Sequence, residues 1–182
     1  IEAAEKMAQL HDKLKEAGYE GHNLRLMLVR LLFCLFAEDT GIFERNLFRD
    51  LIINHTKEDG SDLGMTIAML FQTLNSPEEN RQKILAQHFD DFEYINGKLF
   101  EEHVEMASFD SHMRELLLNA TLVNWSYINR VIFGSLFQDI MDYQKRRNIG
   151  THYTTESNII KHIKSIFLAV LFCSLVFTLI IS

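Results

Sequence analysis

The sequence is poor in the residues that build several common ligand sites. It contains one proline, Pro77, and its eight glycines never occur as Gly-x-Gly. A dinucleotide or phosphate loop with that spacing is therefore absent, and so is any Pro-Pro motif. The two cysteines, Cys34 and Cys173, lie far apart in apolar runs, which excludes a CxxC pair or a zinc knuckle. Buried thiols of this kind favour a reducing compartment, so we expect a cytoplasmic protein.

Metal-ligand and nuclease patterns are also missing. None of the eight histidines forms a His-x-x-His or His-x-x-x-His pair, and no Glu-x-Lys or Asp-x-Lys occurs. The first absence argues against a zinc site and the second against a metal-dependent nuclease centre. The acidic groups at 90–93 and 101–102 are better explained as solvated surface than as a calcium or magnesium site. We expect no metal site and assign no catalytic residue.

The composition is typical of a globular protein, and acidic residues outnumber basic ones. A length of 182 residues with 47% hydrophobic and 24% charged side chains indicates one compact domain. Because 25 acidic residues stand against 18 basic ones, any contact with nucleic acid has to be local. The main cationic concentration is Lys145, Arg146 and Arg147, with Lys161 and Lys164 beyond the next turn. It is either a phosphate contact on DNA or a helix end whose cations balance the helix dipole.

Apolar residues recur at spacings of three and four along most of the chain, which predicts amphipathic helices. Asp62 is expected to cap one helix, and Ser76-Pro77-Glu78-Glu79 is typical of the start of another. Alternating aromatic and polar residues around Asn96-Gly97 indicate one β candidate, a tight turn at 92–100. The predicted fold class is mostly α, an irregular helical bundle with at most one very short β-hairpin. The expected helices are 1–17, 24–36, 43–55, 63–74, 76–88, 109–120 and 125–143, with a further one beginning near 154.

The C-terminal segment is unusually apolar. No charged residue follows Lys164, and Ile166 to Ile181 has only Ser174 and Thr178 as polar positions. A transmembrane helix needs about 17–25 apolar residues, so this segment is at the lower limit. One interpretation is a small helical protein-binding domain anchored to a membrane by this segment. We favour the other, a buried helix or strand, so that a membrane is not the expected partner.

Three stretches, in a consistent order, together resemble one known family. The first is LLFCLFAEDTGIF at 31–43, and the second is YINGKLF at 94–100. The third runs from Trp125-Ser126 through IFGSLFQ at 132–138 to RRNIGTHYT at 146–154. They resemble the helical spacer that precedes the methyltransferase domain in bifunctional Type II restriction-modification enzymes. In that family an adenine-specific DNA methyltransferase is joined to a nuclease.

The resemblance implies a helical spacer at 1–147 and the truncated start of a methyltransferase domain at 148–182. The expected partners are the adjoining nuclease and methyltransferase domains, and DNA through the parent enzyme. In the family, the segment matching Gly150, Thr151, His152, Tyr153 and Thr154 lies against bound S-adenosylmethionine. A glycine and a helix N-terminus suit such a contact, although a polar turn that caps the next helix explains the same residues.

The chain is expected to be inactive by itself and to bind no cofactor alone. Methyl transfer to adenine needs a glycine-rich turn and an Asn/Asp-Pro-Pro-aromatic loop, and the sequence contains neither. A stand-alone helical adaptor would have the same appearance. In either case we expect Trp125 to anchor a core rather than to stack on a base.

The sequence departs from the family pattern at several positions. Glu93 and Lys98 replace a usual proline and glycine, and Asn129 and Arg130 stand where a proline is usual. The uncharged stretch 169–182 replaces a charged amphipathic helix. That last difference suggests a truncated or frame-shifted reading, or a chosen domain boundary.

Overall fold

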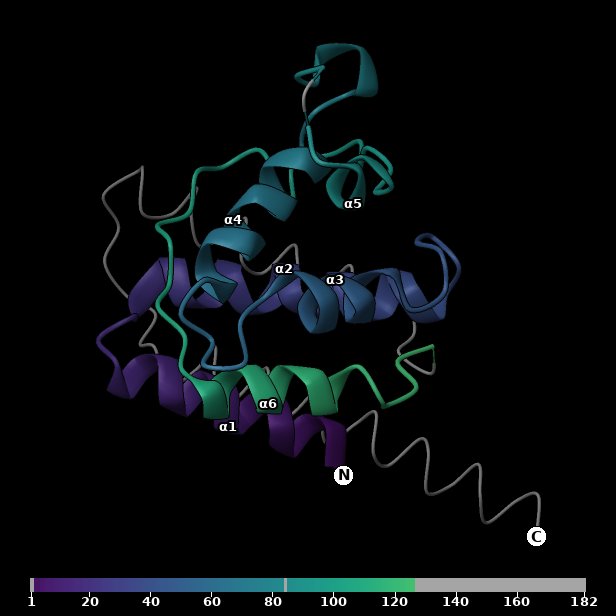
Figure 1. Ribbon diagram of the computed structural model, residues 1–182. Helices are drawn as coiled ribbons and strands as arrows, with labels where there is room; N and C mark the ends of the chain where they lie inside the picture. The colour runs from purple at the N-terminus through teal and green to yellow at the C-terminus, as the bar shows by residue number, and fades with distance from the viewer. Residues whose placement is uncertain (1, 84, 127–182) are drawn as a thin grey trace, which may run out of the picture. The chain divides into compact units, whose positions relative to one another are not determined.

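A computed structural model describes residues 2–83 and 85–126, and α-helices dominate this part of the chain (Figure 1). The elements are α1 (Glu2–Glu16), α2 (Gly21–Asp39), α3 (Leu47–His55), α4 (Leu63–Leu74), η1 (Glu78–Asn80, a 3-10 helix), α5 (Gln87–Asp90) and α6 (Ser111–Ala120). No β-strand occurs among these residues, which confirms the mostly α class. Residues 2–124 form one compact unit. The helices predicted beyond residue 126 lie outside the described residues, as does the domain boundary at 147.

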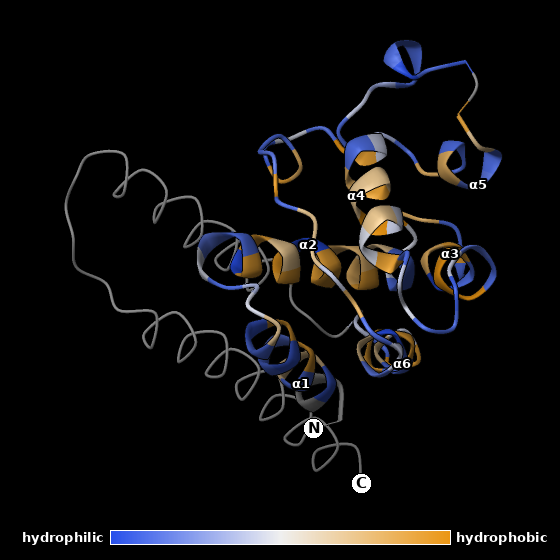
Figure 2. Ribbon diagram, turned by 60° about the vertical axis from the view of Figure 1, so that its left-hand side comes forward, coloured by the Kyte–Doolittle hydropathy of each residue, from blue (hydrophilic) through white to orange (hydrophobic). Residues whose placement is uncertain are grey.

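Helix α2 is the centre of this unit. Every residue from Leu24 to Ala37 is buried, because its sequence is apolar on all sides apart from Arg25 and Arg30. Figure 2 shows the orange of hydrophobic residues along most of this helix. Helices α1 and α3 pack on α2, and α6 lies alongside α1. The amphipathic periodicity of α1 is fulfilled by Met7, Leu10 and Leu14, which face this core.

Aromatic rings join α2 and α4 to the irregular segment that follows α5. The Phe33 ring lies edge-on to Phe43 and Phe100, at centroid distances of 6.2 and 5.6 Å. Phe100 in turn contacts Phe71 of α4 at 5.4 Å, and Phe43 contacts Phe92 at 5.1 Å. These ring contacts, three edge-to-face and that of Phe71 with Phe100 tilted, hold residues far apart in sequence in one core.

Helix α4 begins where the sequence predicts, but the predicted capping side chain does not cap it. Asp110 precedes α6, and its carboxylate accepts a hydrogen bond of 2.7 Å from the Met113 amide. Asp62 precedes α4 as predicted, but its side chain does not cap that helix. It accepts a hydrogen bond from the Lys57 amide instead, at 2.8 Å. The predicted Asp62 cap was therefore wrong, because the preceding loop competes for the same carboxylate.

The predicted helix at 76–88 was wrong. The chain forms only η1 and, after an extended stretch, the four-residue α5. Residues 78–83 are all polar, so a helix there would have no apolar face to bury, and helices this short are marginal without such packing. Arg81 has extended backbone angles, with φ −74° and ψ 150°.

The predicted hairpin at 92–100 was also wrong. Gly97 has a φ of 148°, but Asn96 is not in the left-handed region that a type I′ turn requires. The Ile95 amide donates to the Leu74 carbonyl at the end of α4, at 2.9 Å, rather than to a second strand. The alternation of the sequence instead reflects a loop that buries Phe92, Leu99 and Phe100.

Within residues 2–83 and 85–126, no helix has both the length and the apolar character needed to cross a membrane. The segment that prompted the membrane interpretation, 166–181, lies outside the described residues.

Candidate functional site

The residues that the sequence marks for contact with a cofactor or DNA, at 150–154 and 145–147, lie outside the described residues. The structure does describe the first two stretches of the family resemblance. It brings them together around an irregular loop, residues 91–110, which we call the anchored loop. The candidate site is the set of side chains that hold this loop.

Arg30 joins α2 to the anchored loop. Its Nε donates to the Leu99 carbonyl at 2.7 Å, and Nη2 donates to the Glu102 carbonyl at 2.6 Å. The guanidinium carbon lies 5.4 Å from the ring centroid of Phe71 and 5.5 Å from that of Phe100. One buried side chain therefore supplies both the donors and the packing that fix this part of the loop.

The charge of Arg30 is retained despite its burial. The side chain is 2% exposed, and burial lowers the pKa of its guanidinium to about 10, with Glu102 acting in the opposite direction. The group is protonated at neutral pH. A buried guanidinium requires partners for its donors, and the loop carbonyls provide them.

Two further residues near the start of α2 hold the next part of the loop. The Tyr19 hydroxyl donates to the Glu105 carbonyl at 2.6 Å. Burial, and then the charge of Glu105, raise the pKa of this phenol to about 12, so it remains a donor at neutral pH. His22 Nε2 lies 3.1 Å from both carboxylate oxygens of Glu102. Residues 99–105 are thus fastened at three points to α2 and the turn before it.

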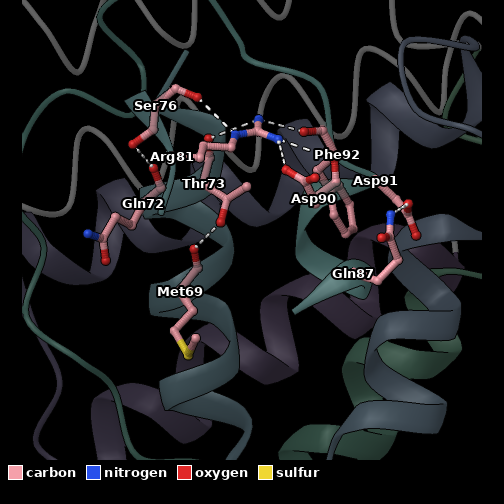
Figure 3. Close-up of polar contacts among 9 residues, drawn as sticks. All are labelled: Met69, Gln72, Thr73, Ser76, Arg81, Gln87, Asp90, Asp91 and Phe92. Carbon is pink, nitrogen blue, oxygen red and sulfur yellow. Dashed lines mark hydrogen bonds and ion pairs between the residues drawn. The ribbon is translucent and has the colours of Figure 1, made fainter. Parts of the chain in front are cut away.

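A second arginine, Arg81, fixes the start of the anchored loop, and Figure 3 shows its contacts. Nε donates to the Ser76 carbonyl at 3.1 Å, and Nη2 donates to the Phe92 carbonyl at 2.7 Å and the Thr73 carbonyl at 3.4 Å. Nη1 reaches both the backbone carbonyl and the carboxylate of Asp90, each at 3.2 Å. The side chain is 4% exposed. Arg81 therefore ties the C-terminal end of α4 to the segment after α5.

The acidic turn of the first resemblance stretch connects α2 to α3. Glu38 Oε1 accepts hydrogen bonds from the amides of Phe48 at 2.9 Å and Arg49 at 3.3 Å, at the start of α3. Burial raises the pKa of the Glu38 carboxyl, against the effect of these two hydrogen bonds. Glu38 thus satisfies amides that α3 itself leaves without partners.

The polar contacts of this site hold parts of the chain together. Among the described residues, no group of three or more His, Cys, Asp or Glu side chains could hold a metal ion. In the same residues, every buried side-chain nitrogen and oxygen has a hydrogen-bond partner. Asp90 pairs with Arg81 and Glu102 with His22, so both acidic groups considered in the sequence analysis contribute to structural contacts. Trp125 is 3% exposed, as expected of a core anchor.

Sequence reasoning missed the two arginines that hold the anchored loop. For Arg30 a signal was available, since an arginine inside an otherwise apolar helix must find buried acceptors. For Arg81 there was none, because it stands in a polar stretch that resembles solvated surface. Of the departures from the family pattern, Glu93 and Lys98 are both exposed, and those at Asn129, Arg130 and 169–182 lie outside the described residues.

Comparisons with known proteins agree with this architecture. Residues 22–100 match the family described as "MmeI, helicase spacer domain". The chain is 42% identical over 172 residues to DNA methyltransferase A of Bacillus subtilis (strain 168), a match that covers 92% of this chain and 19% of that protein. It also resembles the solved structure of MmeI, a Type IIL restriction-modification enzyme in complex with DNA. There the TM-score is 0.69 and the identity 59%, over 94% of this chain and 23% of that one.

Fold and site together define a helical module whose polar core holds an irregular loop. Residues 22–100 match the MmeI helicase spacer family, which confirms the resemblance predicted from the sequence. This range includes both arginines and the first part of the anchored loop. The chain spans about a fifth of the length of these relatives.

Proposed function

We propose that this chain is the helical spacer of an adenine-specific DNA methyltransferase from a restriction-modification system. In the intact parent it connects a nuclease module to an S-adenosylmethionine-dependent methyltransferase module, and by itself it is catalytically incomplete. The observation that carries the proposal is the anchored loop, because two buried arginines make an irregular connection rigid. A spacer needs that property to keep two modules at a fixed separation. The proposed location is the cytoplasm, which agrees with the buried free thiol of Cys34.

We further propose that residues 150–154 contact S-adenosylmethionine in the intact parent. The match to DNA methyltransferase A covers 92% of this chain. The uncovered residues are too few to reach from the C-terminus back to residue 154, so the match extends over this segment. The relative in question is a DNA methyltransferase. The residue types also suit the contact, as Gly150 permits close approach and the hydroxyls of Thr151 and Thr154 can bind a carboxylate.

The DNA contact is proposed for Lys145, Arg146 and Arg147. Between residues 2 and 126, acidic side chains outnumber basic ones 22 to 12, whereas residues 127–182 contain six basic and three acidic ones. Arg30 and Arg81 also direct their donors to backbone carbonyls rather than to the surface. The helical unit therefore repels phosphate, and basic residues able to neutralise it lie further along the chain.

Calorimetry with S-adenosylmethionine tests the proposal. The isolated chain should bind the cofactor more weakly than roughly 1 mM, equivalent to about 4 kcal/mol, because residues 150–154 resemble only one wall of the family's cofactor site and the sequence lacks the glycine-rich turn. In the intact parent, Tyr153→Ala should weaken binding, while Trp125→Ala should mainly lower stability. Tight binding by residues 1–182 alone would contradict the role of a spacer.

A further inference from the structure

We infer that α4 and the neighbouring part of the anchored loop form a docking surface for a basic amphipathic helix of a protein partner. The surface consists of Met65 and Met69 of α4 and Met106 of the loop, which we call the methionine patch. This inference goes beyond the proposed function and holds whether or not residues 150–154 contact a cofactor.

The solvent-facing side of α4 is unusual because it has no charge. The helix contains no charged residue, yet Met65 is 59% exposed and Met69 is 40% exposed. These two residues are one helical turn apart, so they share a face. A helix face open to water normally carries charged residues, as α1 does in the same unit. Figure 2 shows mostly pale and orange colours along α4, whereas the ribbon of α1 carries both blue and orange.

Met106 extends this face onto the anchored loop. It is 59% exposed, and its Cγ lies 3.5 Å from the position that a Cβ on Gly64 would occupy. The loop backbone at Ala107 approaches Gly64 so closely that no side chain would fit between them. Met106 is thereby held beside Gly64, the residue that precedes Met65 in α4. Methionine side chains are flexible and polarizable, which suits a surface that receives a partner.

The charge around the patch identifies the partner. Glu58, Asp59 and Asp62 stand just before α4, where Lys57 is the one basic residue among 57–62, and Glu105 precedes Met106. The amide of Ser61 lowers the pKa of Asp59, so this carboxylate is ionised at neutral pH. An apolar centre with an acidic edge is complementary to a helix that presents apolar residues flanked by Lys or Arg. The acidic edge argues equally against DNA as the occupant.

A binding experiment on the full 182-residue chain tests the inference. The probe is a fluorescein-labelled helical peptide of Leu and Lys with one leucine face, followed by fluorescence anisotropy. The variant M65Q/M69Q/M106Q should bind at least about tenfold more weakly than the wild-type chain. The matched control I42Q/I53Q/L122Q removes three other exposed apolar side chains, at 39, 39 and 67% exposure, and should bind the peptide as the wild type does.

Further measurements separate this occupant from others. A peptide with Glu in place of Lys should bind at least about tenfold more weakly, and the Lys peptide should protect the three methionines from peroxide oxidation. Circular dichroism confirms that each variant is folded. The inference is overturned if the Lys peptide does not bind, if both triple variants bind alike, or if both peptides bind alike. Self-association in sedimentation velocity that the methionine variant abolishes would also overturn it, because the occupant would then be a second copy of the chain.

Discussion

Replacing Arg30 with methionine tests whether the anchored loop depends on this one side chain. Methionine has a similar length and is compatible with an apolar helix, so Arg30→Met removes the charge and the donors without leaving a large cavity. The carbonyls of Leu99 and Glu102 then lose donors that lie at 2.7 and 2.6 Å. Arg30→Lys is the companion variant, since it keeps a charge but lacks the fork that reaches two carbonyls.

The expected loss follows from these contacts. Each carbonyl left without its charged donor costs about 1–3 kcal/mol, and the contacts with Phe71 and Phe100 contribute about 0.5–2 kcal/mol. Removing a buried charge offsets part of this loss, by an amount of a few kcal/mol. We expect Arg30→Met to reduce the free energy of unfolding by about 2–4 kcal/mol, a large share of the 5–15 kcal/mol typical of a whole domain.

Urea denaturation followed by circular dichroism measures this loss, and hydrogen exchange locates it. Amides at 94–105 should exchange faster in Arg30→Met, while those of α6 should change less. Lys83→Met is the matched control because Lys83 is exposed, and it should stay within about 0.5 kcal/mol of the wild type. If Arg30→Met is as stable as the wild-type chain, the loop is held by its aromatic side chains and not by Arg30.

Three further changes test other parts of the structure. Gly64→Ala should reduce the free energy of unfolding by about 1–3 kcal/mol and so lower the thermal midpoint, because the backbone at Ala107 leaves no room for a Cβ. Helix propensity alone predicts the opposite, a gain of about 1 kcal/mol, so a higher midpoint would contradict the close approach of the loop. Asp110→Ala should reduce the free energy of unfolding in urea by about 1 kcal/mol, because it removes the cap of α6. Asp62→Ala should reduce it less, since Asp62 does not cap α4, and equal losses would contradict this difference. Burial, and then His55, lower the pKa of His88, so the native state favours its neutral form and stability should fall as pH drops below about 6.5. In the wild type the His88 ring stacks on the His55 ring at a centroid distance of 3.9 Å. The urea midpoints at pH 7.5 and 5.5 should therefore differ less in His88→Gln than in the wild type. An unchanged difference would exclude a contribution of His88 to the pH dependence of stability.

The fold was predictable where one local signal dominated. In α1 and α4 the apolar spacing determines which face is buried, whereas α2 is apolar on nearly all sides and is buried throughout Leu24 to Ala37. The three observed helices lie within a few residues of the predicted ones. The prediction failed at 76–88 and 92–100, where tertiary contacts outweigh local signals. A capping sequence at Ser76-Pro77 cannot extend a helix that has nothing to pack against. An Asn-Gly pair likewise cannot form a hairpin when the neighbouring amide bonds to α4.

The anchored loop explains why a spacer has buried arginines where leucine would seem sufficient. The backbone of an irregular segment cannot satisfy its own carbonyls, and each one buried without a donor is destabilising. Arg30 and Arg81 supply several donors each from fixed positions, so the loop is held at its backbone as well as by its apolar side chains. Backbone anchoring tolerates changes at exposed loop positions such as Glu93 and Lys98. The same geometry also holds Met106 over Gly64, so rigidity of the loop and presentation of the methionine patch have a common cause.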